Sequence, residues 1–444
     1  MVRLETALRR RDVNARDDGE FGRHGTAIRI ALGVLVVTAV AILLTPVGFP
    51  DLHVYRTGGY AWSHGIPLYS PEFRQYVPLE TGLPFLYPPL AAVAFFPAHL
   101  LPWHVAKVLL VAAGMAALVA TTTVVAGRTH GRRTGAVVLG GAVAAGWLLF
   151  EPVRQTVFFG QINLLLMGLV VVDCLLPRTR WPRGLLTGLA AGIKLTPLIF
   201  VLFFLIKRQY RAAAVAVGTF AGSILLGFAL APGDSVRFWF DAVFETDQKV
   251  GTAYAFNQSL NGVLHRVLPE ADGARFGLWA LLVAAFLVVA LVGARRARSV
   301  GDDVTALLAI AFWGLLASPL SWSHHWVWVA PAAVALAYPL YRGARRRWWV
   351  PGLATMLVLV FTVGTHSVVL STDPGTPETA WVWWQHLAGS SYTLVAVVAL
   401  LVLAVRRRTV SSHAGASVTV PPDAPEAPGT PEAPEAQGAA KPDA

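Results

Sequence analysis

The chain consists largely of apolar segments separated by short basic clusters, and this pattern constrains its fold most. The segments span residues 29–47, 86–101, 104–126, 135–150, 160–176, 184–206, 212–231, 276–294, 304–320, 326–341, 350–370 and 391–405. A helix needs about 20 apolar residues to cross a hydrocarbon core. Only 14% of the residues are charged, against about 25% in soluble domains. The sequence therefore predicts an all-α polytopic membrane protein with about 12 transmembrane helices. It excludes a water-soluble enzyme, a nucleic-acid-binding domain and a secreted disulfide scaffold.

The two ends of the chain carry cytoplasmic signals. Residues 1–28 are polar and basic, and no small-residue cleavage site ends the segment 29–47. We therefore expect a cytoplasmic N-terminal segment followed by a retained first helix. Three arginines, 406–408, follow the last apolar segment, and residues 409–444 are rich in Pro, Ala and Glu. Such a composition cannot bury a core, so it predicts a disordered cytoplasmic tail after a membrane domain of residues 29–408.

The side on which residues 102–183 lie is open to two interpretations. If the segment 86–101 crosses the membrane, six arginines of the flanking joints fall outside, against the positive-inside rule: Arg128, Arg132, Arg133, Arg178, Arg180 and Arg183. If it only dips into the membrane, and 184–206 is two half-helices broken before Pro197, all six fall inside. We favour the second interpretation. A broken helix in a membrane is tolerated where its freed backbone groups line a protein cavity.

The joints expected on the outer face, 48–85, 232–275 and 371–388, carry few net charges and many aromatic residues. Asp51 directly follows the first apolar segment. It suits two roles equally, either a helix N-cap or a general base held at the membrane boundary. The next carboxylates, Glu72 and Glu80, are distant in sequence, so Asp51 has no adjacent acidic partner.

Polar residues also interrupt the apolar segments. Gln161 and Asn163 open the segment 160–176, and Lys194 lies inside 184–206. A lysine within a membrane segment is costly and indicates a functional site, although such a side chain also reaches an interface by extending along the helix. The run Asn257-Gln258-Ser259 precedes another apolar segment and by itself is typical of a polar turn.

Two adjacent histidines, His324 and His325, follow Trp322 at an outer helix junction. Neighbouring residues on a helix point about 100° apart, so the pair is poorly placed to share one zinc ion. We expect them to hydrogen-bond an anion or a sugar instead.

In this order along residues 48–330, these motifs resemble those of the polyprenol-phosphate-mannose-dependent α-1,2-mannosyltransferases, GT-C-type enzymes of glycosyltransferase family 87. The matching runs are Asp51, Gly65 to Tyr69, Tyr87 to Leu90, Gly160 to Asn163, Lys194 to Pro197, Asn257 to Gly262 and Ser318 to His325. The resemblance implies an inverting transferase with an active site on the outer face of the cell membrane. Its donor would be polyprenyl-phosphate-mannose. Its acceptor would be a membrane glycolipid, either a phosphatidylinositol mannoside or a lipomannan or lipoarabinomannan.

The resemblance assigns the general base to Asp51. Many GT-C enzymes carry an acidic pair in the first loop that helps to bind a metal, and Asp51 lacks such a partner, so the comparison favours a metal-independent mechanism with one carboxylate and no cofactor. Cations near the leaving phosphate are expected to stabilise its charge, and the candidates are Lys194 and His325, with His324 or Arg56. The expected hydrogen-bonding partners of sugar or phosphate are Gln161, Asn163, Asn257 and Gln258. The aromatic residues expected to pack on sugar faces are Tyr55, Tyr87, Trp322 and Trp326.

Other functions remain open at this point. A transporter or flippase would show inverted repeats with a site at the membrane midplane, and the segment spacing shows no such symmetry. A transferase of another sugar, arabinofuranose or glucose, is the main alternative, because residue types do not distinguish the sugars. Beyond lipids, donor and acceptor, the sequence identifies no protein partner.

Overall fold

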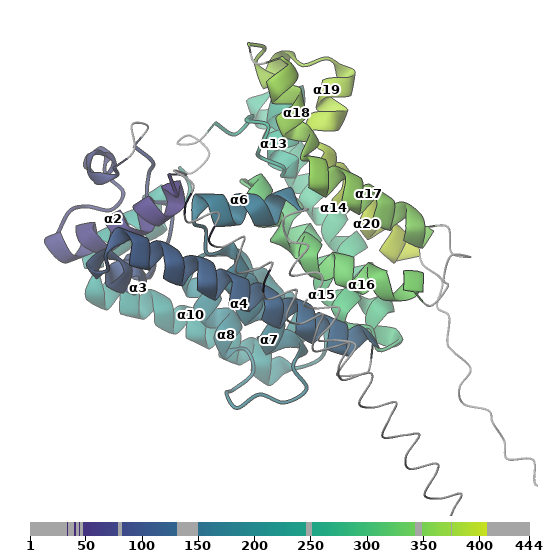
Figure 1. Ribbon diagram of the computed structural model, residues 1–444, viewed down its shortest axis with the longest axis horizontal. Coiled ribbons are helices and arrows are strands. Elements are labelled where there is room, and N and C mark those ends of the chain that lie inside the picture. The colour runs from purple at the N-terminus through teal and green to yellow at the C-terminus, as the bar shows by residue number, and fades with distance from the viewer. Residues whose placement is uncertain are drawn as a thin grey trace, which may run out of the picture. The chain divides into compact units, whose positions relative to one another are not determined.

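The computed structural model describes residues 48–78, 82–130, 150–245, 251–341, 349–373 and 375–405, besides isolated positions before residue 48 (Figure 1). The predicted segments 29–47 and 135–150, the N-terminal segment and the C-terminal tail fall outside these ranges. The described elements of the first half are α2 Pro50–His64, η1 Pro71–Tyr76, α3 Pro89–Leu100, α4 Trp103–His130, α6 Glu151–Phe159, α7 Asn163–Leu175, α8 Leu185–Ile193, η3 Thr196–Phe200, α9 Val201–Ile206 and α10 Tyr210–Leu230.

The second half continues in the same way. Its elements are α11 Pro232–Arg237, η4 Phe238–Ala242, α13 Leu260–Val267, α14 Asp272–Ser299, α15 Asp303–Ala317, η5 Ser323–Trp328, α16 Val329–Tyr341, α17 Trp349–Val363, α18 Thr365–Thr372, η7 Glu378–Ala380, α19 Trp383–Gly389 and α20 Ser391–Val405. Within the described ranges the only strand-like pairing is one isolated bridge between Asn257 and Trp322. The all-α prediction is therefore confirmed for the part of the chain that the structure describes.

Three helices, α4, α10 and α14, are long and apolar enough to cross a membrane. The described residues provide up to six spans if each strongly bent helix pair counts as one, and the sharpest bend, 118°, separates α6 from α7. The total of about 12 crossings stays a prediction. Helix α6 was not expected, because its nine residues carry too few apolar side chains to stand out as a segment.

The predicted break in 184–206 is confirmed, but it lies three residues before Pro197. Helix α8 ends at Ile193, and Lys194 adopts extended backbone angles (φ −147°, ψ 130°). Glycines allow α8 to approach α10 closely: a Cβ on Gly188 would lie 2.5 Å from the Ala216 carbonyl oxygen. Small residues permit such contacts between membrane helices, and this packing leaves the α8 end at a defined place in the helical body.

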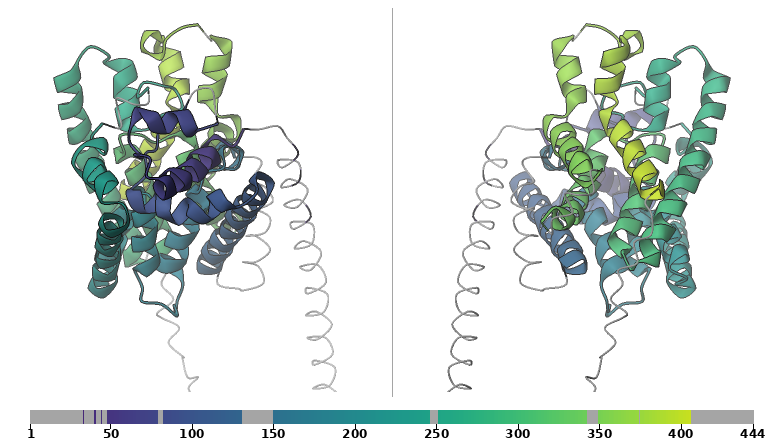
Figure 2. Two further views of the ribbon diagram at one scale, coloured as in Figure 1. Left: turned by 90° about the vertical axis from the view of Figure 1, so that its left-hand side faces the viewer. Right: turned by 90° about the vertical axis from the view of Figure 1, so that its right-hand side faces the viewer.

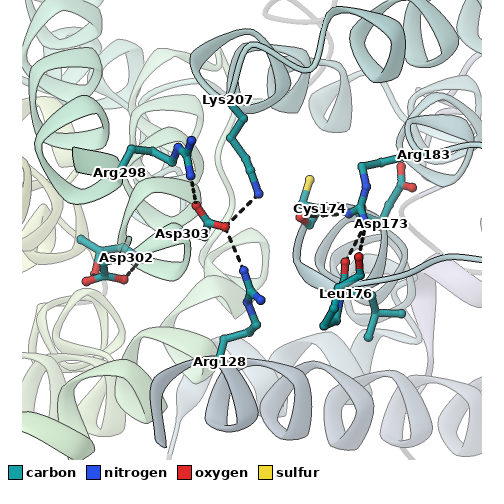
Figure 3. Close-up of polar contacts among 11 residues, drawn as sticks. Arg128, Asp173, Cys174, Leu176, Arg183, Lys207, Arg298, Asp302 and Asp303 are labelled. Carbon is teal, nitrogen blue, oxygen red and sulfur yellow. Dashed lines mark hydrogen bonds and ion pairs between the residues drawn. The ribbon is translucent and has the colours of Figure 1, made fainter. Parts of the chain in front are cut away.

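A buried carboxylate, Asp303, joins four helix ends (Figure 3). It accepts from Arg128 of α4 at 2.9 Å, from Lys207 after α9 at 2.8 Å and from Arg298 of α14 at 2.9 Å. Arg128 therefore lies close to Lys207 and Arg298, as the second interpretation of residues 102–183 expects, and the side of the membrane on which they lie stays a prediction. Helix α3, with 12 residues, is about 18 Å long at 1.5 Å per residue, and this is too short to cross a hydrocarbon core.

We expect Asp303→Asn to lower the free energy of unfolding by about 2 kcal/mol, because three cations lose their charged partner. The partial exposure of Arg128 and Arg298 keeps the loss below that of a fully buried pair. Thermal unfolding of the purified protein in detergent measures the change. The matched control is Asp302→Asn. Asp302 caps α15 by accepting from the Thr305 N–H at 2.9 Å, and asparagine caps helices equally well. An equal loss in both variants would contradict the role of the Asp303 charge.

Candidate functional site

A cavity of about 770 Å³ brings together most of the predicted site residues. Its wall is built from the start of α2, the residues before α3, the α6–α7 turn, the break after α8 and the turn between α15 and η5. The predicted site residues that line it are Asp51, Tyr87, Gln161, Lys194, Trp322, His324 and His325. This volume lies in the range of small-molecule and cofactor sites.

Asp51 lies in the first turn of α2, beside the cavity. Phe49 holds the N-cap position, with left-handed backbone angles and no side-chain cap, so the N-cap interpretation of Asp51 is wrong. Burial raises the pKa of Asp51 from 3.8 to about 7, and the Lys194 charge and hydrogen bonds to Gln161 and Tyr87 oppose this rise. A carboxyl group with this pKa exchanges a proton near neutral pH, as a general base requires.

A hydrogen-bonded layer of side chains lies behind the carboxylate. The Tyr55 hydroxyl donates to Gln161 Oε1 at 2.8 Å and lies 3.1 Å from the Tyr87 hydroxyl. Tyr55 is buried and stacks on Phe95, with ring centroids 4.3 Å apart. It therefore does not line the cavity, and its contact is with Gln161 rather than with a sugar.

Lys194 is held at the break by two partners. Its Nζ donates to Asn163 Oδ1 at 3.0 Å and lies 3.1 Å from His325 Nε2. An ammonium group has only donors, so His325 Nε2 accepts this hydrogen bond and the imidazole is neutral. Asn163 also donates to the His324 carbonyl oxygen at 3.0 Å. Asn163 therefore positions both Lys194 and the histidine turn from behind the cavity wall.

His324 differs from its neighbour. Its side chain is 6% exposed, and neither ring nitrogen has a hydrogen-bond partner among the described residues. Its ring lines the cavity and packs edge-on against Phe159, with centroids 5.2 Å apart. A buried unpaired polar group costs free energy, so the two ring nitrogens of His324 are unsatisfied hydrogen-bonding groups beside the cavity.

Besides Tyr55 and Asn163, four more predicted site residues do not line the cavity. Arg56 donates to the carbonyl oxygens of Ala98 and Leu101 at 2.6 and 2.7 Å, so it secures the end of α3. Asn257 and Gln258 are fully buried, and their amides bind backbone groups of the loops around them. Trp326 is also fully buried and packs on Phe312, Phe361 and Tyr392 in the core.

A polar residue in a sequence can bind either the backbone of a loop or a ligand. For Asn257 and Gln258 the sequence did not show which of the two applies. Within the described ranges, no group of three or more His, Cys, Asp or Glu side chains is arranged to hold a metal ion.

The comparison with known families decides the class of protein. Residues 85–319 match the model of glycosyltransferase family 87. The chain belongs to this family. It is 39% identical over 368 residues, 79% of this chain and 83% of the relative, to the polyprenol-phosphate-mannose-dependent alpha-(1-2)-phosphatidylinositol mannoside mannosyltransferase of Mycobacterium tuberculosis.

Two other curated relatives carry similar names. The Mycolicibacterium smegmatis protein with the same name as the first relative is 40% identical over 82% of this chain and 86% of its own length. A phosphatidylinositol pentamannoside mannosyltransferase of M. tuberculosis is 35% identical over 86% of this chain and 88% of its own length. No solved structure matches the chain.

Several residues of this family 87 glycosyltransferase line the cavity without having been singled out from the sequence. They are Phe159, Phe238, Tyr254 and Phe256, among others. Tyr254 and Phe256 stack on each other, with centroids 5.2 Å apart, just before Asn257. An aromatic pair beside a polar motif is a usable sequence signal. Nothing in the sequence, however, places this loop opposite Asp51.

Gly160 sets the turn that carries Gln161 to the cavity. Its φ is +69°, and a Cβ there would lie 2.9 Å from Leu52 and from Phe49. We expect Gly160→Ala to cost about 2 kcal/mol of unfolding free energy through left-handed strain and displacement of α2, and to lower activity. The control is Gly222→Ala in α10, where a Cβ meets nothing within 4 Å, and alanine stabilises a helix. Thermal unfolding and turnover assays measure both, and unchanged values for Gly160→Ala would contradict this role of the turn.

Proposed function

We propose that this family 87 glycosyltransferase transfers mannose from polyprenyl-phosphate-mannose to the 2-hydroxyl of a mannose on a phosphatidylinositol mannoside, with α-1,2 linkage. The printed names of its relatives supply the donor and the acceptor class. The observation that carries the proposal is one cavity lined by both a carboxylate, Asp51, and a half-buried ammonium group, Lys194.

The chemistry assigned to Asp51 is proton removal. As the acceptor 2-hydroxyl attacks the anomeric carbon, its oxygen forms the new glycosidic bond and the carboxylate takes its proton. The bond between the anomeric carbon and the phosphate oxygen breaks at the same centre, and the electron pair leaves with the phosphate. One such displacement turns a β-linked donor into an α-linked product. The raised pKa of Asp51 suits this exchange near neutral pH.

The leaving polyprenyl phosphate gains negative charge, and fixed donors in a water-poor site stabilise it. Lys194 provides the cation, and its two partners hold it in place. His324 supplies a further ring N–H, since no described side chain occupies its nitrogens. His325 then serves as the neutral acceptor that orients Lys194, rather than as a second cation.

The site belongs on the outer face in this proposal. Phe49, two residues before Asp51, packs on Trp103 at the start of α4, and Arg128 near the end of α4 joins the basic cluster around Asp303. Trp103 and Arg128 are 25 residues apart in α4, which corresponds to about 38 Å along a helix. Basic clusters mark the cytoplasmic side. The cavity then opens at the opposite face of a multi-pass cell-membrane protein with about 12 crossings and cytoplasmic termini.

We expect Asp51→Asn to reduce turnover at least about 10³-fold while leaving folding intact, because the amide cannot accept the hydroxyl proton. The assay incubates purified protein with radiolabelled polyprenyl-phosphate-mannose and phosphatidylinositol mannoside acceptors. Thermal unfolding in detergent serves as the folding control. Near-wild-type turnover in this variant would reject Asp51 as the base, and absence of transfer by the wild type would reject the substrates.

The pH dependence follows from the pKa of Asp51. The base works when deprotonated, so we expect kcat/KM to fall as the pH drops through about 7. Gln161→Leu removes a hydrogen bond that lowers the pKa of Asp51, so the acidic limb of the kcat/KM profile of this variant should move to higher pH. His64→Gln, at the exposed far end of α2, is the control and should leave the limb in place. A limb that stays fixed in Gln161→Leu would show that another group titrates.

A further inference from the structure

A second carboxylate, Glu151, is buried next to the site but is not among the residues that line the cavity. It lies in the first turn of α6 and is 3% exposed. Its Oε1 accepts from the Ser323 hydroxyl at 2.8 Å, and its Oε2 accepts from the Tyr392 hydroxyl at 2.7 Å. The carboxylate therefore joins α6 to η5 and to α20.

The partners of Glu151 connect it to the histidines. Ser323 is the first residue of η5 and directly precedes His324. The Thr156 hydroxyl, one and a half turns along α6 from Glu151, donates to the His324 carbonyl oxygen at 2.9 Å. Helix α6 thus holds the start of η5 at two consecutive residues, and Asn163 adds a third contact at the His324 carbonyl. None of the three residues that make these contacts, Glu151, Thr156 and Asn163, lines the cavity itself.

Glu151 also faces a buried histidine. His366 Nε2 lies 3.6 Å from Glu151 Oε1, and the His366 ring packs edge-on against Phe256 of the cavity wall, with centroids 4.6 Å apart. A carboxylate inside a membrane protein is costly, and replacing a buried polar group by packed apolar residues often does not reduce stability. Stability alone therefore does not require an acid at this position.

We propose that Glu151 is a positioning residue for the transfer reaction, holding the His324-His325 turn through Ser323 so that His324 faces the leaving phosphate and His325 stays bonded to Lys194. This inference rests on the proposed function and adds a residue to it. Loss of the contact displaces two cavity groups together: the ring nitrogens of His324 and the acceptor that fixes the Lys194 ammonium group. A small displacement of a catalytic group lowers the reaction rate by a large factor.

The chain offers a matched pair of variants for the test. Ser323→Ala and Tyr392→Phe each remove one hydroxyl from the same carboxylate, but only Ser323 belongs to the histidine turn. We expect Ser323→Ala to lower kcat about 10-fold or more with the KM for the donor changed less than about 2-fold. Tyr392→Phe should leave kcat within about 2-fold. Glu151→Leu, which removes both acceptor oxygens, should resemble Ser323→Ala, and the double variant Glu151→Leu/Ser323→Ala should lose no more than the larger single loss.

Asp303→Asn is the control for general destabilisation, since it also removes a buried carboxylate but none of its ion-pair partners lines the cavity. It should lower the unfolding temperature and leave kcat unchanged. Equal kcat losses in Ser323→Ala and Tyr392→Phe, or a kcat loss in Asp303→Asn as large as that in Glu151→Leu, would overturn the inference.

A structural measurement tests positioning without turnover. In cryo-EM structures, we expect the separation of Lys194 Nζ and His325 Nε2 to exceed hydrogen-bonding distance in Ser323→Ala and to stay near 3.1 Å in Tyr392→Phe. An unmoved turn in Ser323→Ala would overturn the inference whatever the rates. If the wild type transfers no mannose from the proposed donor, the proposed function fails, and this measurement still decides whether Glu151 positions the turn.

Discussion

A positive charge held inside an apolar helical body is the constraint on which the rest of the site depends. Burying an ammonium group without partners is strongly unfavourable, and Lys194 receives two partners at the point where α8 ends. One of them, Asn163, begins α7, and the other belongs to the turn that starts η5. The position of the ammonium group therefore determines how three separate parts of the chain meet around the cavity.

The charged groups around Asp303 and those around the cavity differ in their partners. At Asp303, three cations lie at hydrogen-bonding distance from one carboxylate, so each cation has a charged partner within the protein. At the cavity, Lys194 has only neutral hydrogen-bond partners, and the nearest acid, Asp51, interacts with it electrostatically across the same space. The first arrangement holds helices together. The second leaves a cation available to an anionic group.

The sequence predicted several site residues for reasons that remain valid in the structure. Asp51, Lys194 and the histidine pair stand out because a charged or polar side chain next to an apolar segment is costly, and all four side chains line one cavity. The same reasoning was misleading for Arg56, which binds carbonyl groups at the end of α3. It was also misleading for Gln258, whose amide is fully used by backbone groups. A sequence shows that a polar group must be satisfied, but it does not show whether protein or ligand satisfies it.

Hydropathy and the order of motifs are properties of the linear chain, and they were enough to predict the all-α class, a break in the segment 184–206 and the family. Three findings required the folded structure: which polar residues share the cavity, that Glu151 contacts the residue before the two histidines, and that Arg128, Lys207 and Arg298 share Asp303. These facts depend on contacts between residues more than 70 positions apart. Such contacts follow from how helices pack against one another, and the local pattern of a sequence carries little information about that packing.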